Sequence, residues 1–88
     1  MSEQMEDEIR RVLVAYGRLP VDVSNIGRTD DLYRAGLTSH ASVNVMLGLE
    51  DAFDVEIPDE LLRKSTFQTV AVIEAALRSL VENVQARN

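Results

Sequence analysis

The chain of 88 residues suits one domain with one modest core, because single domains usually contain about 50–250 residues. Its apolar content of 45% is ordinary for a folded domain, and the absence of cysteine excludes both a disulfide framework and a thiolate metal site. The net charge of −6 disfavours nucleic acid as a partner, because phosphates require a basic surface.

The first predicted element is an amphipathic helix over residues 3–16. Apolar residues recur there in steps of three and four, as on one face of a helix: Met5, Ile9, Val12, Leu13 and Tyr16. Acidic residues crowd the first two turns and Arg10 and Arg11 follow, an order that suits the helix dipole. Gly17 and then Pro20 mark the end of this helix.

Residues 18–37 form a long connection without a sustained hydrophobic period. Its scattered apolar residues predict an ordered loop pinned across the bundle: Leu19, Val21, Val23, Ile26, Leu32, Tyr33 and Leu37. A helical turn at Asp30-Asp31-Leu32-Tyr33 and a short strand at Val21–Val23 are both compatible with the sequence. A long connection in so small a domain is usually functional.

A second helix is predicted over residues 39–53, with Thr38 as its N-cap. Its expected buried face comprises Val43, Met46, Leu47 and Phe53, and Glu50 interrupts that face near the end. Val45 and Leu49 fall off this face, as spare core or as part of a partner surface. Gly48 weakens the helix and allows a neighbour or a ligand to approach closely.

Two further helices complete the predicted fold. Pro58 is preset for the first position of a short helix over residues 58–62, and Ser65-Thr66-Phe67-Gln68 has the capping-box pattern that opens a last helix over residues 66–84. The apolar face of this last helix comprises Phe67, Val70, Ile73, Ala76, Leu77, Leu80, Val81 and Val84. Three substantial helices and a short one predict a small all-α bundle, because each apolar stripe must be buried.

Ser39 is the most informative single residue. It begins a helix, where backbone N–H groups have no partner and favour a phosphate ester. The plainer interpretation is an ordinary serine at a helix start, and Ser42 is the nearest rival attachment point. His40 has no second histidine with which to bind a metal, and it cannot form a catalytic pair with its sequence neighbour, since such groups converge from separate elements. We predict no catalytic residue, no metal site and no enzymatic activity.

The acidic residues are distributed unevenly. Six carboxylates occur without a base among them: Glu50, Asp51, Asp54, Glu56, Asp59 and Glu60. The other nine acidic residues balance the nine Lys and Arg residues, so this one face accounts for the net charge. It suggests a basic partner surface reached with electrostatic steering, although a merely solvated face would look the same.

Nothing in the sequence indicates a membrane partner. No apolar run approaches the length of a membrane span, and the mostly charged residues 1–11 lack the apolar segment of a signal peptide. We expect a cytoplasmic protein.

The sequence DLYRAGLTS of residues 31–39 resembles the D-L-x-x-x-G-x-D-S motif of the acyl and peptidyl carrier proteins. The sequence LEDAF of residues 49–53 and DVEIPDE of residues 54–60 are also similar to that family. The resemblance covers nearly all of residues 1–88, which we expect to form a single carrier domain. It implies a four-helix bundle with a long first loop and a short third helix.

The resemblance also implies a function. A phosphopantetheinyl transferase would attach 4′-phosphopantetheine to Ser39, and the thiol of this arm would shuttle acyl or aminoacyl groups as thioesters. Further partners would be an acyl- or aminoacyl-loading ligase and downstream transferases or synthases, all meeting a monomer. The docking face would comprise Thr38, His40, Val43, Met46, Glu50, Asp51, Asp54 and Glu56. Val43, Met46, Leu47 and Ile73 are also candidates to line a cargo cavity, although core packing explains them equally well.

Two departures from the family pattern qualify this function. Thr38 replaces the usual Asp before the serine and cannot supply a carboxylate to a metal ion, and His40 replaces the usual Leu or Met after it. They suggest a specialised carrier instead of the housekeeping carrier of fatty-acid synthesis, similar to stand-alone carriers loaded with amino acids. The alternative is an unmodified helical adaptor that binds a basic partner through its acidic face. A helix-turn-helix nucleic-acid binder is disfavoured, because a recognition helix needs bases.

Overall fold

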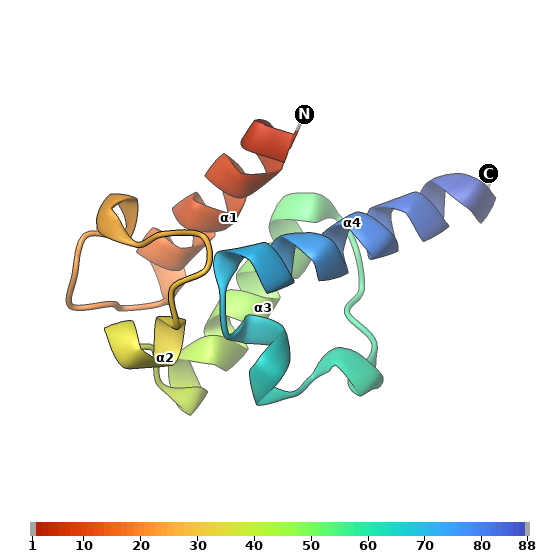
Figure 1. The fold of residues 1–88 in the computed structure, drawn as a ribbon. Coiled ribbons are helices and arrows are strands. Elements are labelled where there is room, and N and C mark those ends of the chain that lie inside the picture. The colour runs from red at the N-terminus through yellow and green to blue at the C-terminus, as the bar shows by residue number, and fades with distance from the viewer. Residues whose placement is uncertain (1, 88) are drawn as a thin grey trace.

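The computed structural model describes the backbone of residues 2–87 and the side chains of residues 4–82. This part of the chain is helical and contains no strand (Figure 1). The α-helices are α1 (Ser2–Tyr16), α2 (Leu32–Ala35), α3 (Ser39–Phe53) and α4 (Val70–Arg87), and the 3-10 helices are η1 (Val23–Asn25), η2 (Asp59–Leu61) and η3 (Lys64–Phe67). The predicted all-α bundle is therefore confirmed.

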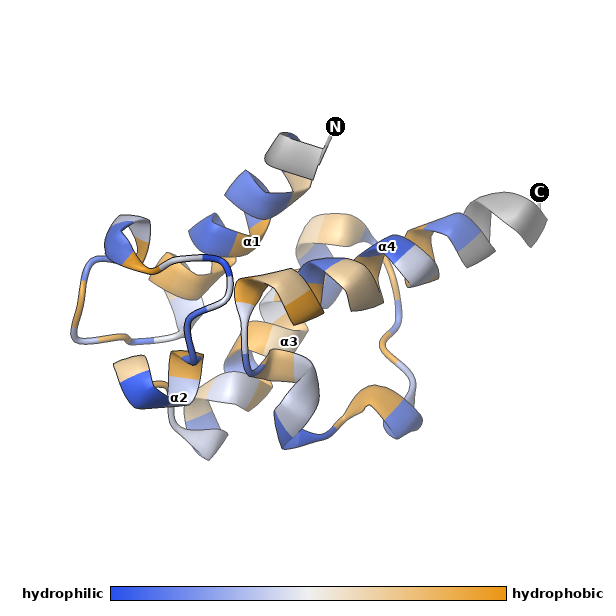
Figure 2. Cartoon of the chain, viewed as in Figure 1, coloured by the Kyte–Doolittle hydropathy of each residue, from blue (hydrophilic) through white to orange (hydrophobic). Residues whose placement is uncertain are grey.

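The three long helices, α1, α3 and α4, pack around one hydrophobic core to which the loops also contribute. Figure 2 shows both hydrophilic and hydrophobic residues on each of them, as amphipathic helices require. The largest fully buried side chains are Ile9, Leu13, Leu32, Val45, Leu49, Val70, Ile73 and Leu77. The predicted faces of α1 and α4 are thus largely buried. Tyr16, which was assigned to the α1 face, is 45% exposed, and the side chain of Val84 lies outside the described residues.

The buried face of α3 differs from the predicted one. Its buried residues are Ala41, Val45, Gly48 and Leu49. Val43 and Leu47, which the sequence assigned to the core, are 52% and 53% exposed. The prediction was wrong because it gave no weight to the small residues Ala41 and Gly48. With them, the buried positions follow the helical spacing i, i+4, i+7 and i+8.

Gly48 allows the close approach that the sequence predicted. The aromatic ring of Tyr16 in α1 packs against it, so that a Cβ atom at this position would lie only 2.6 Å from Cδ2 of the ring and 2.9 Å from Cγ1 of Val12. A larger residue would separate α1 from α3, because interiors are close-packed.

The long connection is an ordered loop, as predicted. Its residues Val23, Ile26, Leu32 and Leu37 are buried in the common core. The predicted helical turn is α2, with Asp31 as its N-cap. The alternative of a strand at Val21–Val23 is wrong, because Val21 is exposed and Val23 begins the 3-10 helix η1.

A chain of ion pairs ties this loop to two helices. Arg28 in the loop lies 2.6 Å from Glu6 of α1 and 3.0 Å from Glu74 of α4. Glu74 is buried, and its other carboxylate oxygen accepts a hydrogen bond of 2.7 Å from Arg78. Arg28 therefore links α1 to α4 across the loop.

The short third helix is the 3-10 helix η2, which is shorter than the predicted 58–62 and has Pro58 as its N-cap. The tight i to i+3 bonds of a 3-10 helix suit so short a segment. Leu61 N–H donates to the carbonyl of Pro58 at 2.9 Å, which closes this single turn.

The start of the last helix was predicted wrongly. Residues 64–67 form η3 instead of the first turn of α4, which begins at Val70. The hydroxyl of Thr69 accepts a hydrogen bond of 3.0 Å from Val72 N–H, so Thr69 caps the helix. Gln68, the expected end of the capping box, instead donates to the Asp31 carboxylate at 3.3 Å. A tertiary contact thus replaces the local motif.

Gly36 supplies a first testable prediction. Its φ of 122° is unfavourable for any residue with a side chain, and a Cβ atom there would lie 2.8 Å from Cγ of Pro20. We expect Gly36→Ala to lower the free energy of unfolding by about 1–3 kcal/mol, measured by urea denaturation. Gly27→Ala is the control, because its Cβ would meet only the exposed carboxylate of Asp30, at 3.1 Å. Equal losses in both variants would contradict this account of the turn.

Candidate functional site

Ser39 is the first residue of α3, and the chain before it explains why it is exposed. Gly36 ends α2, where its N–H donates to the carbonyls of Leu32 and Tyr33. Leu37 is then buried and anchors the chain, and its N–H donates to Leu32 O at 2.9 Å. The next residues, including Ser39, point to solvent.

Thr38 is the N-cap of α3, as predicted. Its backbone is extended, and its hydroxyl oxygen accepts a hydrogen bond of 3.0 Å from Ala41 N–H. Within the described part of the chain, the N–H groups of Ser39 and His40 have no acceptor. An anion on the Ser39 side chain therefore meets unpaired N–H groups and the positive end of the helix dipole.

The hydroxyl groups of the two candidate serines differ in their surroundings. Ser42 is half-buried, and its hydroxyl donates to the Ser39 carbonyl at 2.7 Å. The Ser39 hydroxyl is exposed and makes no hydrogen bond to any described residue. Ser39 is thus the more accessible oxygen nucleophile.

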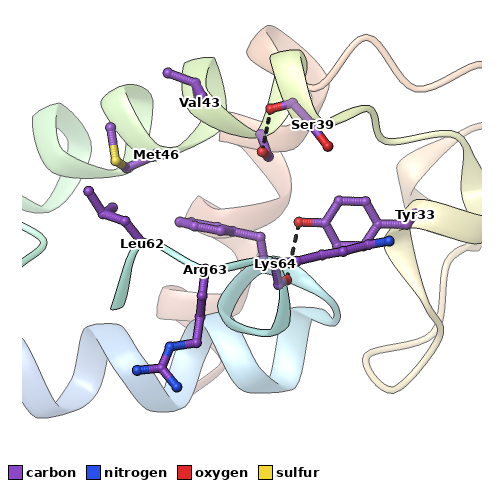
Figure 3. Close-up of a pocket in the computed structure, with 9 residues that line it drawn as sticks. Tyr33, Ser39, Val43, Met46, Leu62, Arg63 and Lys64 are labelled. Carbon is purple, nitrogen blue, oxygen red and sulfur yellow. Dashed lines mark hydrogen bonds between the residues drawn. The ribbon is translucent and has the colours of Figure 1, made fainter. Parts of the chain in front are cut away.

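A groove of about 310 Å³ opens beside Ser39 (Figure 3). It runs between α3 and the segment from η2 to η3. Its lining residues are Tyr33, Ser39, Ser42, Val43, Met46, Leu62, Arg63, Lys64 and Phe67. Apolar side chains dominate this lining, whereas Ser39 and Ser42 provide hydroxyl groups at the α3 side.

Tyr33 closes the groove at the end where Figure 3 shows Ser39. The Tyr33 hydroxyl donates to the Lys64 carbonyl at 3.1 Å, and the Lys64 ammonium lies 4.8 Å from the centre of the Tyr33 ring. Burial raises the pKa of the Tyr33 hydroxyl, although an interaction with the Ser42 hydroxyl opposes that rise. The hydroxyl is therefore a neutral donor near pH 7.

Asp31 supports this end of the site by binding the backbone of Tyr33. Its carboxylate accepts hydrogen bonds from the N–H groups of Tyr33 and Arg34, at 2.9 and 3.3 Å, and from Gln68. Burial raises the pKa of this carboxyl, but the hydrogen bonds outweigh burial and keep the pKa below its ordinary value. An ionised Asp31 holds α2 to the segment before α4.

His40 and Thr38 border a second hollow on the other side of Ser39. Its remaining lining residues are Gly17, Arg18, Ala41 and Asn44. Both Thr38 and His40 are exposed, so the structure leaves them accessible beside Ser39. The predicted docking residues Val43 and Met46 instead line the groove.

The acidic residues of the predicted docking face do not behave alike. The Glu50 carboxylate accepts a hydrogen bond of 2.8 Å from Ile57 N–H, so this half-buried residue also holds the loop after α3. Asp51, Asp54 and Glu56 are exposed, and Asp54 ends α3 in the left-handed conformation with φ 52°. Their charges are available to a partner.

The predicted cargo-cavity residues are not all brought together. Val43 and Met46 line the groove, but Leu47 is exposed outside it and Ile73 is buried in the core. Other residues that line the groove were not predicted to do so from the sequence, namely Tyr33, Leu62, Arg63, Lys64 and Phe67. Tyr33 and Lys64 are far apart in the sequence and are brought together only by a tertiary hydrogen bond. No local pattern in the sequence could therefore have indicated that they meet.

The described residues contain no group of three or more His, Cys, Asp or Glu side chains placed to hold a metal ion. No helix among them is long and apolar enough to cross a membrane.

Comparison with known proteins agrees with this geometry. A family model described as a phosphopantetheine attachment site matches residues 15–77. An aminoacyl carrier protein of Agrobacterium fabrum is 43% identical over 82 residues, which are 93% of this chain and 99% of the relative.

Solved structures are also similar. One chain comes from the crystal structure of an engineered Bradyrhizobium japonicum glycine:[carrier protein] ligase complexed with carrier protein from Agrobacterium tumefaciens and AMP. It is 45% identical with a TM-score of 0.81, and the match covers 83% of the present chain and 97% of the other. The solution structure of ATC2521 from Agrobacterium tumefaciens is 42% identical with a TM-score of 0.74, over 92% and 98% of the two chains.

Thr38 gives the prediction for this site. We expect Thr38→Ala to lower the free energy of unfolding by about 0.5–2 kcal/mol, because the Ala41 N–H loses its acceptor. Thr38→Ser should retain most of the stability, since serine keeps the accepting oxygen. Urea denaturation of the three proteins provides the measurement, and an equal loss in both variants would show that the methyl group, not the cap, is what matters.

Proposed function

The chain belongs to the family of domains with a phosphopantetheine attachment site, and we propose that it is an aminoacyl carrier protein modified on Ser39. The observation that carries this proposal is the exposed, unbonded hydroxyl of Ser39 at the start of α3. When bound, the phosphopantetheine arm supplies the thiol that this cysteine-free chain lacks. That thiol holds an acyl group as a thioester.

The residues around Ser39 fit this group. The Ser39 oxygen would attack the pantetheine-bearing phosphorus of coenzyme A and pass its proton to a base of the transferase. The P–O bond of the pyrophosphate would break, adenosine 3′,5′-bisphosphate would leave, and the new phosphodiester would carry one negative charge. The unpaired N–H groups of Ser39 and His40 and the dipole of α3 favour that charge, typically by about 0.3–1 kcal/mol at a surface. Thr38 keeps this end of the helix ordered while leaving these N–H groups free.

The proposed cargo is an amino acid. Two similar proteins support an amino acid as the cargo. One is described as an aminoacyl carrier protein, and the other is a chain from a structure of a glycine:[carrier protein] ligase complex. Thr38 and His40 also depart from the pattern of housekeeping acyl carriers. The proposed partners are a phosphopantetheinyl transferase, an amino acid:carrier protein ligase and downstream transferases.

The acidic face at the end of α3 supports docking on basic partner surfaces. Glu50 and Asp51 occupy the last turn of α3, Asp54 caps its end, and no basic residue is present in that turn. Carboxylates at this end oppose the helix dipole and reduce helix stability. Their presence is explained by electrostatic steering of basic partners toward Ser39.

We further propose that residues 1–88 work as one domain, without catalytic activity of their own. A cytoplasmic monomer is the state that the sequence predicts. It leaves the surface around Ser39 open to several partners in turn.

Intact-mass spectrometry after enzymatic modification tests the attachment site. The chain is incubated with coenzyme A and a phosphopantetheinyl transferase, and the intact mass should rise by one arm. Ser39→Ala should abolish the increase, because it removes the nucleophilic oxygen. Ser42→Ala is the matched control and should still be modified. An unmodified wild-type chain would favour the acidic-face adaptor, and a modified Ser39→Ala variant would refute the site.

The docking face is tested by charge reversal. We expect Asp51→Lys combined with Glu56→Lys to lower the kcat/KM for loading by the glycine:[carrier protein] ligase about tenfold at low salt, because steering is lost. The difference from wild type should shrink at high ionic strength. Asp7→Lys is the control, since this exposed carboxylate lies on α1. A comparable loss in Asp7→Lys would point to net charge instead of this face.

A further inference from the structure

The groove beside Ser39 is lined by apolar and basic side chains, and this lining affects which cargo the arm can place there. Its lining contains no Asp or Glu residue, whereas Arg63 and Lys64 both contribute to it. We propose that this groove is a charge filter, which holds the arm when its end is uncharged and excludes it when an aminoacyl group adds an ammonium. This inference rests on the proposed attachment at Ser39.

The apolar part of the groove is suited to an uncharged occupant. Figure 3 shows half-buried Met46 opposite Leu62. Leu62 is 43% exposed, and Val43, which also lines the groove, is 52% exposed. A ligand that covers these side chains removes apolar surface from water, which is favourable. The volume of about 310 Å³ is at the lower end for small-molecule sites, so it suits the end of an arm with a small acyl group.

The occupant is attached at the edge of the groove, because Ser39 is one of its lining residues. Figure 3 shows Ser39, Tyr33 and Lys64 at one end and Met46 and Leu62 at the other. An arm that starts at Ser39 therefore passes Lys64 before its end reaches the apolar part. Tethering raises the local concentration of the arm, so weak contacts are sufficient to hold it.

Lys64 provides a fixed positive charge on this route. Its ammonium lies 4.8 Å from the centre of the Tyr33 ring, and its carbonyl accepts the Tyr33 hydroxyl at 3.1 Å. Arg63 contributes mainly its aliphatic part, because its guanidinium donates to the Glu60 carbonyl at 2.7 and 3.0 Å. Lys64 is thus the cation of this groove that an incoming ammonium would meet.

An ammonium in this groove finds no partner. It would lose part of its water and meet no carboxylate in the groove lining, and a charge that loses water without gaining a partner is disfavoured. The carboxylates of Glu50, Glu56 and Asp59 are outside the groove lining, in an adjoining hollow that shares Met46 and Leu62 with the groove. The α-amino group of an aminoacyl thioester is mostly protonated below pH 7, given an ordinary pKa of about 7.7–8.0. Loading with an amino acid would therefore move the arm out of the groove and leave the cargo open to the next enzyme.

Glycyl and propionyl groups provide a matched pair for the test, because they have nearly the same shape and differ by an ammonium in place of a methyl. Each is installed on the wild-type chain from its coenzyme A thioester by a phosphopantetheinyl transferase. Methyl NMR spectra at pH 6.5 then report groove occupancy through Val43, Met46 and Leu62, with Ser39→Ala as the unmodified reference. We expect the propionyl arm to shift these methyl signals and the glycyl arm to occupy the groove about tenfold less.

Lys64→Glu is the decisive variant, since it places a carboxylate where the lysine ammonium was. Lys64 is exposed, and the Tyr33 hydroxyl binds its backbone carbonyl, so the fold should be retained. We expect the glycyl arm to enter the groove of this variant. Arg34→Glu is the control, because Arg34 is exposed on α2 outside the groove lining, and it should still exclude the glycyl arm.

The possible failures are distinguishable. Equal methyl shifts from both arms in the wild-type chain would mean that the ammonium passes through the groove, and would overturn the filter. No shift from the propionyl arm would show that the groove does not hold the arm. If no arm can be attached, the mass spectrum shows it, and then the attachment at Ser39 fails together with the filter.

Discussion

The position of Ser39 depends on how the long connection before it is held. Residues 18–37 contain little regular helix, so side chains must fix their path. Arg28 pairs with Glu6 of α1 and with the buried Glu74 of α4, while Arg10 of α1 donates to two loop carbonyls at 2.7 and 2.8 Å. Arg28 is 48% exposed, so water reduces the net stabilisation from these pairs. Their main effect is to select one path for the loop, because the buried Glu74 carboxylate has Arg78 at one oxygen and would leave the other without its partner if Arg28 moved away.

Much of the fold was predictable because its signals are local. The bounds predicted for α1 and α3 are close to those observed, since caps and apolar spacing act within a few residues. The rotation of α3 was not predictable in this way, because its core face depends on Gly48, a residue that carries no hydrophobic signal of its own. Gly48 is buried because Tyr16 and Val12 of α1 pack against it. The predicted start of α4 was wrong for a similar reason, since Gln68 contacts Asp31 instead of completing a capping box.

The candidate site also has a part that the sequence predicts through local signals and a part that it does not. Ser39 and its cap Thr38 could be identified from the sequence, because the motif and the helix start are contiguous. The opposite side of the groove could not, because Leu62 and Lys64 belong to a different segment that is aligned by the Tyr33 hydroxyl. A motif can locate an attachment point, but only packing determines what lies beside it.

Several features along α3 do not help to stabilise the isolated domain. Val43 exposes apolar surface, the N–H groups at the start have no acceptor among the described residues, and carboxylates oppose the dipole at the end. Each has a counterpart in the proposed function, namely the arm for the apolar groove, the phosphodiester for the N–H groups and a basic partner for the carboxylates. The carboxylates are kept out of the groove, where Lys64 contributes a positive charge instead. In the proposed function, one helix would thereby separate a surface that attracts partners from a surface that responds to the charge of the cargo.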